Sequence, residues 1–178
     1  MPVSHYRHIA SVLSAVEQYK AAKSILEIGP GFGKYGTLLR ERFDVRFERY
    51  YKHQWLVLID CLEIYQPYIT PVHNYLYDHV LIGDIVKEVE TINNYDIILM
   101  LEVLEHLPKD VGKVLLPKLM NKTNYVFVVS FPRSFREGSG SEWPNPNEEH
   151  KCLWAKAELD NVIGLTTSHS PTVFSKVK

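Results

Sequence analysis

Five short apolar runs, separated by segments of helical character, constrain this chain more than any other feature. They cover residues 24–28, 56–63, 80–82, 97–100 and 125–129. The runs are almost continuously apolar rather than alternating, which is typical of strands that are buried on both faces. Strands of this kind that alternate with helices form a parallel sheet between two helical layers. We therefore predict an α/β fold.

The segments between these runs carry apolar residues at the three- and four-residue spacing of a helix. We expect helices over 9–16, 34–42, 67–76, 85–92, 110–120 and 155–162, and a short β segment after the last of them. Pro71 falls inside the third helix, and we expect it to bend or shorten that helix.

The overall composition indicates one globular domain over residues 1–178, with 46% apolar and 23% charged residues. The net charge of −1 gives no global attraction to nucleic acid or to anionic membranes. No apolar run suits a signal peptide or a membrane span, and Cys61 and Cys152 form no CxxC pair. We expect a cytoplasmic protein with reduced cysteines, without a membrane partner.

A cofactor site is predicted where the apolar runs end, because ligands of parallel sheets bind outside the carboxyl ends of the strands. The first run ends in a loop whose glycines let the backbone approach a ligand closely. Glu63 ends the second run and is placed to accept hydrogen bonds from a ribose diol, and Asp84 follows the third and could accept from an adenine amino group. The loop contributes Glu27, Gly29, Pro30, Gly31 and Gly33.

Other interpretations of these residues are weaker. Residues 31–36 satisfy GxGxxG, but the acid after the second strand lies about thirty residues beyond the glycines instead of roughly twenty. Glu27 would repel a pyrophosphate and attract an ammonium group. The glycines could be turn residues, Asp84 a helix N-cap and Glu63 a solvated carboxylate. Three acids and a glycine loop at successive strand ends favour a cofactor site over these separate explanations.

Residues 26–33, with the sequence LEIGPGFG, resemble the ExGxGxG motif of class I S-adenosylmethionine-dependent methyltransferases. The resemblance continues through Glu63, through Gly83 and Asp84, and through 95–107. It implies a Rossmann-like sheet of seven strands with the last one antiparallel, and S-adenosylmethionine as cofactor. Glu27 and the glycines would hold its methionine end, Glu63 its ribose and Asp84 with Ile85 its adenine. Leu101 completes the expected cofactor-binding set.

Acceptor-side residues are expected after the fourth strand and in the segment 131–150. This segment is rich in Pro, Gly, Ser and Asn, and is predicted to be a long lid or acceptor loop. Glu102, His106 and His150 are the candidate catalytic residues, since a hydroxyl acceptor needs a general base. The further candidates near the acceptor are Glu105, Arg133, Arg136 and Trp154.

Glu102, Glu105 and His106, completed by His150, also have the residue types of a divalent-metal site. The ExxEH turn, with His150-Lys151 and Trp154 later, is similar to small-RNA 2′-O-methyltransferases that act on 3′ ends. O-methyltransferases of quinone biosynthesis are a second metal-dependent group with a similar pattern. Very many class I methyltransferases carry a similar turn without metal, with the glutamate on backbone and the histidine near the cofactor. The metal-free alternative is favoured.

Two other segments bear on the acceptor. Residues 145–159 resemble a group of bacterial and phage methyltransferases with an N-x-x-E-x-H-x-x-x-W stretch, which identifies no acceptor. The run 40–55 mixes basic and aromatic residues, as single-stranded nucleic-acid sites do, but its three acids favour a solvated connection.

The sequence thus predicts a methyltransferase that acts on oxygen of a small molecule or glycan. The alternatives are a metal-assisted RNA 2′-O-methyltransferase and a catalytically silent module that binds the cofactor or a partner. A nicotinamide dehydrogenase is a more distant one.

Overall fold

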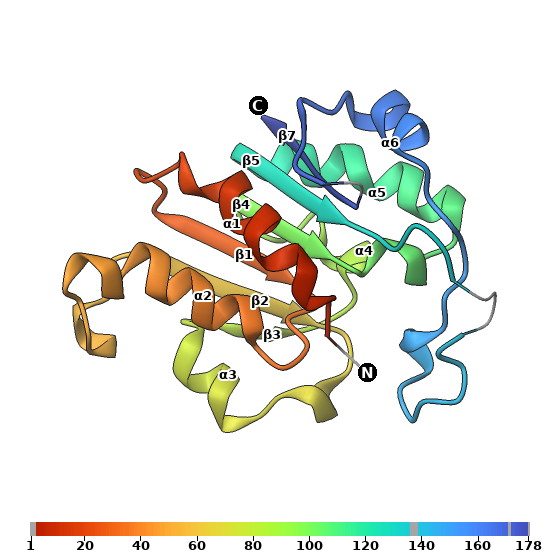
Figure 1. Ribbon diagram of the computed structural model, residues 1–178. Helices are drawn as coiled ribbons and strands as arrows, with labels where there is room; N and C mark the ends of the chain where they lie inside the picture. Colours follow the sequence, from red (N-terminus) through yellow and green to blue (C-terminus); the bar gives the residue numbers. More distant parts are fainter. Residues whose placement is uncertain (1–2, 136–138, 171, 178) are drawn as a thin grey trace.

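The computed structural model describes residues 3–135, 139–170 and 172–177 and shows one seven-stranded sheet between two helical layers (Figure 1). The strand order is β3-β2-β1-β4-β5-β7-β6. The strands are β1 (Ser24–Ile28), β2 (Leu58–Glu63), β3 (Val80–Ile82), β4 (Tyr95–Leu101), β5 (Thr123–Ser130), β6 (Thr167–Ser168) and β7 (Val173–Val177).

The pairing confirms the predicted sheet. The pairs β2–β3, β1–β2, β1–β4 and β4–β5 are all parallel. β7 runs antiparallel both to β5 and to the two-residue β6, so the last strand is the one that runs in the opposite direction. Because β1 to β5 are parallel, their carboxyl ends lie along the same edge of the sheet (right in Figure 1).

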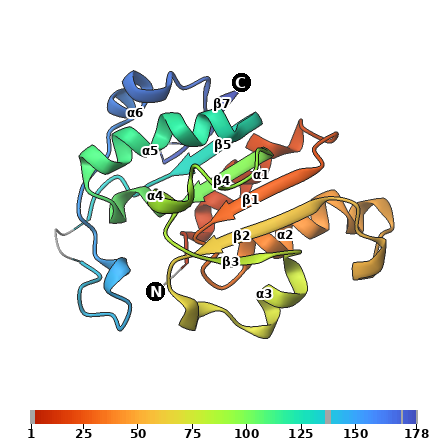
Figure 2. The ribbon, with the colours of Figure 1, turned by 180° about the vertical axis from the view of Figure 1, so that it is seen from behind.

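Helices cover both faces of the sheet (Figures 1 and 2). One core contains buried residues of α1 (Ile9–Glu17), α2 (Lys34–Phe43) and α3 (Pro71–Leu76). The other contains buried residues of α4 (Ile85–Glu88), α5 (Lys109–Lys122) and α6 (Lys156–Ile163). Alternate strand residues contribute to each core; Ile97 of β4 belongs to the first and Ile98 to the second. This explains why the strands read as continuously apolar.

The predicted helix over 67–76 is wrong as a single element. Gln66–Tyr68 forms a short 3-10 helix, and α3 begins at Pro71. Proline is compatible with the first helical position, where its missing N–H has no intrahelical acceptor. Pro71 therefore starts a helix instead of bending one. The predicted helix over 85–92 is also shorter, because α4 ends at Glu88.

The basic and aromatic run 40–55 has a structural role at its centre. The Arg40 guanidinium is 2% exposed and donates to Asp44 Oδ2 at 3.0 Å and to Asp78 Oδ2 at 2.6 Å. Arg49 Nε donates to Asp44 Oδ1 at 2.9 Å, and the Trp55 ring stacks against Arg40 at 4.3 Å. These cations are paired with carboxylates and do not form a nucleic-acid site, but the centre of the run is buried and not the solvated connection expected from the sequence. No helix within the described ranges is long and apolar enough to span a membrane.

Candidate active site

A cavity of about 690 Å³ lies at the carboxyl edge of the sheet. It is lined by residues that follow β1, β2, β3 and β4, by the amino-terminal residues 3–5 and by residues between 139 and 151. Segments that are far apart in the sequence therefore enclose one space, where ligands of parallel α/β sheets bind.

The glycine loop forms one wall of this cavity. Gly29, Gly31 and Gly33 have φ angles of 70°, 55° and 80°, a left-handed conformation that favours glycine. A Cβ atom at Gly29 would lie 2.6 Å from Val103 Cγ2, so a larger residue has no room there. His73 Nε2–H donates to the Gly31 carbonyl at 2.8 Å, which ties the loop to α3. The predicted tight turn is thus present and is anchored from outside the loop.

Glu27 lies in the cavity wall at the end of β1 and is only 2% exposed. The Tyr77 hydroxyl donates to Glu27 Oε2 at 2.6 Å. Burial raises the pKa of Glu27 to about 8, although the Tyr77 hydrogen bond and the nearby Lys34 both lower it. A buried carboxyl with a raised pKa is poised to gain a cationic partner, because a positive charge stabilises its ionised form.

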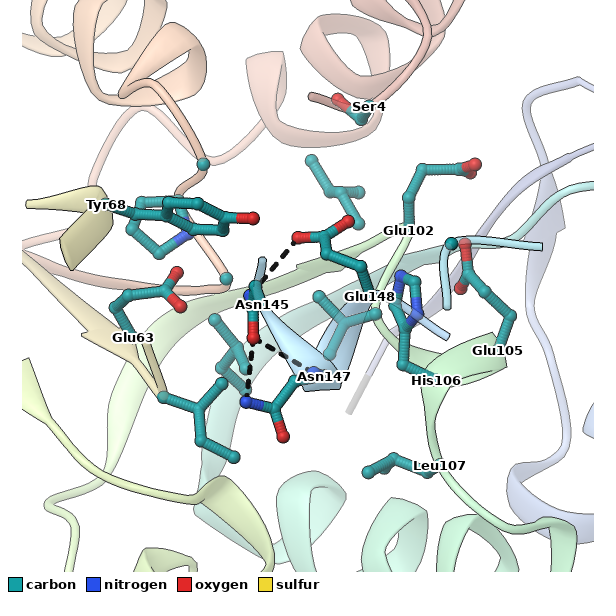
Figure 3. Close-up of a pocket in the computed structure, with 18 of the residues that line it drawn as sticks. Ser4, Glu63, Tyr68, Glu102, Glu105, His106, Leu107, Asn145, Asn147 and Glu148 are labelled. Carbon is teal, nitrogen blue, oxygen red and sulfur yellow. Dashed lines mark hydrogen bonds between the residues drawn. The ribbon is translucent and has the colours of Figure 1, made fainter. Parts of the chain in front are cut away.

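Glu63 ends β2 at the other side of the cavity and is 4% exposed. The Tyr65 backbone N–H donates to Glu63 Oε1 at 2.8 Å, and burial raises the pKa of the carboxyl. Figure 3 shows Glu63 and Tyr68 facing Asn145 and Glu148 across the cavity. The carboxylate is therefore held at the cavity surface and is not a solvated surface group.

Asp84 and two apolar residues complete the predicted cofactor set. Asp84 Oδ1 accepts from the Val86 N–H at 2.9 Å, so Asp84 is the N-cap of α4 and also lines the cavity. Ile85 and Leu101 are each 5% exposed and line the same cavity. The structure thus places all the predicted cofactor-binding residues except Gly33 in its lining, and Gly33 directly precedes Lys34, which lines it.

The described part of segment 131–150 contributes to the opposite wall (Figure 3). Asn145 is 2% exposed; its Oδ1 accepts from the Asn147 N–H at 2.9 Å and its Nδ2 donates to Glu148 Oε1 at 3.4 Å. The Lys151 N–H donates to the Glu105 carbonyl at 2.8 Å and ties the end of this segment to the turn after β4.

The other acceptor-side candidates have separate positions. Arg133 is exposed outside the cavity lining. Trp154 is 4% exposed and lies in the core beside Gly112, in the same buried cluster as Leu104. Arg136 lies outside the described residues. Of the late candidates that the structure describes, His150 is therefore the one that reaches the cavity.

Glu102 adopts a left-handed backbone conformation, with φ of 54°, directly after β4. Its Oε1 accepts from Ser130 Oγ at 3.0 Å and lies 3.5 Å from His8 Nδ1. Burial raises the pKa of the Glu102 carboxyl, opposed by the Ser130 hydrogen bond and by Lys34. This carboxylate therefore faces the amino-terminal segment and the end of β5.

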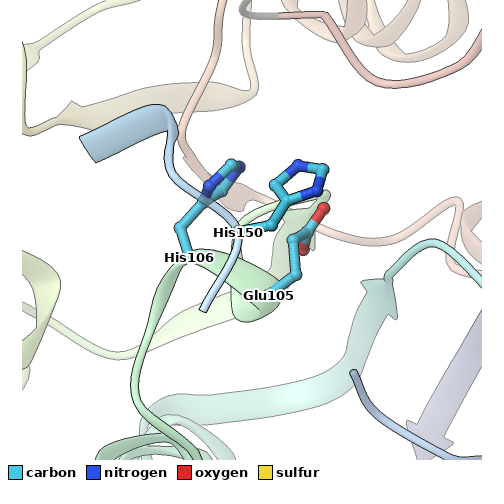
Figure 4. A group of neighbouring side chains, drawn as sticks. All are labelled: Glu105, His106 and His150. Carbon is cyan, nitrogen blue, oxygen red and sulfur yellow. The ribbon is translucent and has the colours of Figure 1, made fainter. Parts of the chain in front are cut away.

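Glu105, His106 and His150 form a separate cluster, in which one ligand atom from each residue lies within 4.8 Å of the others (Figure 4). Glu105 is 1% exposed, and burial together with Glu102 raises its pKa well above the ordinary value. Burial lowers the pKa of His106 and of His150, which favours neutral imidazoles. Of the four metal candidates, the structure brings three together; Glu102 does not belong to this group.

Sequence reasoning missed several residues of the cavity. Tyr68, at the end of the 3-10 helix Gln66–Tyr68, lines the cavity but belongs to no recognisable motif. Tyr77 lies behind the cavity wall, where its contact with Glu27 depends on how the chain between α3 and β3 packs beside β1. Lys34 was visible only as part of the glycine loop; it lines the cavity, and its Nζ donates to the Ser4 carbonyl. Ser4 and His5 carry no pattern at all, because their position depends on how the chain enters α1.

No family model matches this sequence, and no curated protein matches it. Solved structures with a similar fold are nevertheless found. Magnesium protoporphyrin IX methyltransferase of Synechocystis PCC 6803, with bound SAH, aligns with a TM-score of 0.63 and 13% identity, over 97% of this chain and 82% of the other. A SAM-dependent methyltransferase of Archaeoglobus fulgidus aligns with a TM-score of 0.61 and 18% identity, over 90% and 69% of the two chains.

An O-methyltransferase family protein of Burkholderia thailandensis gives a TM-score of 0.63 with 10% identity, over 97% of this chain and 56% of its own. At these identities the likeness concerns the fold. The chain has the fold of class I S-adenosylmethionine-dependent methyltransferases, as the motif resemblance implied.

Proposed function

We propose that this protein is an S-adenosylmethionine-dependent methyltransferase. The observation that carries the proposal is the meeting of the Glu27, Glu63 and Asp84 carboxyl groups, from three successive strand ends, around one cavity. The fold alone would not suffice, since one fold hosts many functions. The solved structure of similar fold with bound SAH adds support for the same ligand class.

The residues present fit this cofactor. Glu27 is a buried carboxyl whose raised pKa would be relieved by the ammonium of a methionine moiety. Gly29 and Gly31 bring backbone to the cavity surface without side chains. Glu63 would accept from ribose hydroxyls, and Asp84 with Ile85 would contact the adenine. The cavity volume of about 690 Å³ falls in the usual range for small-molecule sites.

The chain's own contribution to the reaction is positioning. S-adenosylmethionine supplies an electrophilic methyl group on a sulfonium. Holding the two reactants in line supplies a large part of the rate enhancement of such a displacement. The wall formed by Asn145, Asn147 and Glu148 bounds the cavity opposite Glu63.

We propose an oxygen of a small molecule or glycan as the methyl acceptor. His106 and His150 line the cavity, and their lowered pKa values make them neutral bases near pH 7, able to take a hydroxyl proton. Glu102 is the third candidate base. Four carboxylate residues, Glu102, Glu105, Glu142 and Glu148, line this part of the cavity. The negative charge of the less buried Glu142 and Glu148 disfavours a polyanion such as RNA and favours a neutral acceptor.

Calorimetric titration with S-adenosylhomocysteine, in matched buffers with and without a divalent-metal chelator, tests the cofactor. We expect saturable one-to-one binding in both buffers and no comparable binding of NADH. A folded protein that gives neither heat nor a thermal shift with S-adenosylhomocysteine would refute the proposal. Methyl transfer to a panel of neutral hydroxyl compounds, with RNA oligonucleotides as comparison, then tests the acceptor class; binding without turnover on any of them would instead favour a silent module.

A further inference from the structure

We propose that Glu105, His106 and His150 form a binding site for a divalent transition metal at the acceptor side of the cavity. Glu105 and His106 belong to η5 (Leu104–His106), the turn after β4, and His150 comes from the far end of the segment that follows β5. The proposal concerns metal binding by these three side chains, which is measured apart from methyl transfer. With an ion bound, the lone pairs of His106 and His150 would be on the metal, and Glu102 would be the candidate base that remains.

The first argument is convergence. One carboxylate oxygen and one nitrogen from each imidazole lie within 4.8 Å of one another (Figure 4). The two ring centroids are 4.9 Å apart with a tilt of 56°, so the rings are not stacked face to face. Small side-chain adjustments bring such atoms to the roughly 2.0–2.2 Å metal distances of nitrogen and carboxylate ligands.

The second argument is an unsatisfied buried carboxyl group. Glu105 Oε2 is buried and has no hydrogen-bond partner among the described residues. A buried polar atom without a partner costs about 1–3 kcal/mol, and more when the group is charged. A cation at this position would remove that cost. Glu105 also lines the cavity, so an ion can reach it.

The third argument is the orientation of the two histidines. His106 Nδ1–H donates to the Glu149 carbonyl at 3.2 Å, which leaves the lone pair of the neutral ring on Nε2. His150 Nδ1 is bonded to Ser139 Oγ at 3.0 Å. Metal-binding histidines use one ring nitrogen for the metal and the other for such an outer contact, which fixes the ring. Here both rings already have the outer contact.

Two imidazoles and one carboxylate favour Zn²⁺ and similar transition metals over Mg²⁺ or Ca²⁺, which prefer oxygen ligands. Three protein ligands leave at least one position for a water or a ligand oxygen. Glu105, His106 and His150 all line the cavity, so this position would face bound molecules. Glu102 is engaged with Ser130 and His8 and stays outside the site.

The test is calorimetric titration of chelator-treated full-length protein with Zn²⁺, supported by the visible absorption of the Co²⁺ form. We expect saturable binding of one ion. The Glu105→Gln and His150→Ala substitutions each remove a ligand and should weaken Zn²⁺ binding by more than the roughly 10–100-fold typical of outer-contact changes. Ser139→Ala removes only the outer contact of His150, so it should weaken Zn²⁺ binding by no more than this roughly 10–100-fold range.

Matched controls separate ligand loss from general damage. His53→Ala removes an exposed histidine and should bind Zn²⁺ like the unmodified protein. Glu102→Gln removes a neighbouring charge that raises the pKa of Glu105, so it should alter Zn²⁺ affinity much less than Glu105→Gln does. Glutamine matches the size of the Glu105 side chain, and a thermal melt without metal checks that this variant folds. Absence of saturable binding would overturn the proposal, and so would a Zn²⁺ affinity of Glu105→Gln or His150→Ala equal to that of the unmodified protein. S-adenosylhomocysteine affinity is measured separately, so failure of the metal site and failure of the proposed function are distinguishable.

Discussion

The hydroxyl of Tyr77 donates a hydrogen bond of 2.6 Å to the Glu27 carboxylate, and both side chains are buried. Tyr77 follows α3 while Glu27 belongs to β1, fifty positions earlier. Gly36 makes this contact feasible, because a Cβ at that position would lie 2.5 Å from the Tyr77 hydroxyl. The orientation of the central carboxyl group of the cavity therefore depends on three separate segments.

Tyr77→Phe should destabilise the protein by about 1 kcal/mol, because one hydrogen bond is lost and a buried carboxyl oxygen loses its donor. We also expect weaker binding of S-adenosylhomocysteine, since Glu27 loses its fixed orientation. Chemical denaturation and calorimetry measure the two effects. Tyr75→Phe is the control, because Tyr75 is 53% exposed. Equal behaviour of the two variants would show that the Tyr77–Glu27 bond is unimportant.

Glu27→Gln should make folding stability less sensitive to pH. The pKa of Glu27 is raised from 4.5 to about 8 in the folded protein, so the folded state binds more protons than the unfolded state between these values. Stability is therefore lost as pH rises through this window. The variant lacks this loss, and its stability relative to the unmodified protein should grow on the order of 1 kcal/mol per pH unit. Denaturation curves at pH 5, 6.5 and 8 check this; a constant difference contradicts it.

Gly29→Ala should destabilise the fold more than Gly164→Ala does. Both glycines have positive φ angles, of 70° and 61°, so both substitutions carry backbone strain of about 1–2 kcal/mol. At Gly29 the new methyl group would also lie 2.6 Å from Val103 Cγ2, whereas at Gly164 it would lie 3.6 Å from Lys176 Nζ. Shortening Val103 to alanine should recover part of the extra cost. Thermal unfolding of the single and double variants measures this recovery. If Val103→Ala recovers none of the stability lost in Gly29→Ala, the explanation by steric contact is wrong.

Glu63→Ala should weaken S-adenosylhomocysteine binding by about 1–3 kcal/mol, because polar groups of the ligand lose their partner in a buried setting. The reference variant is Glu41→Ala, which removes an exposed carboxylate of α2. Calorimetry gives both affinities. Unchanged affinity in a folded Glu63→Ala protein would refute the role proposed for this residue.

Strand positions could be predicted from sequence because burial on both faces leaves a continuous apolar run, as in β1, β4 and β5. The rule that ligands bind at the carboxyl ends of parallel strands predicts from the sequence alone that Glu27, Glu63 and Asp84 lie together. Local sequence signals gave a wrong prediction where one residue type is compatible with two structures. Pro71 can break a helix or begin one, and the outcome depends on the preceding residue, Thr70, which is extended and is the N-cap of α3.

The acceptor side was harder to predict because its residues come from segments without periodicity. Glu102 and Glu105 are three positions apart, yet the left-handed backbone at Glu102 directs it toward Ser130 instead of the histidine cluster. His150 joins Glu105 only because residues 151 and 152 hydrogen-bond to the Glu105 carbonyl. The ExxEH turn and a later histidine were recognisable in the sequence, but which of these residues meet is set by tertiary structure.

The place of β7 in the sheet affects how the protein acquires its structure. β7 is the last of the strands in the chain, but it lies between β5 and β6 rather than at an edge. Until β7 docks, the hydrogen-bonding groups on one side of β5 remain free to pair with another chain. Non-local pairing of this kind slows folding and prolongs the lifetime of association-prone intermediates. Refolding yield should therefore fall as protein concentration rises, with β5 as the segment most in need of protection.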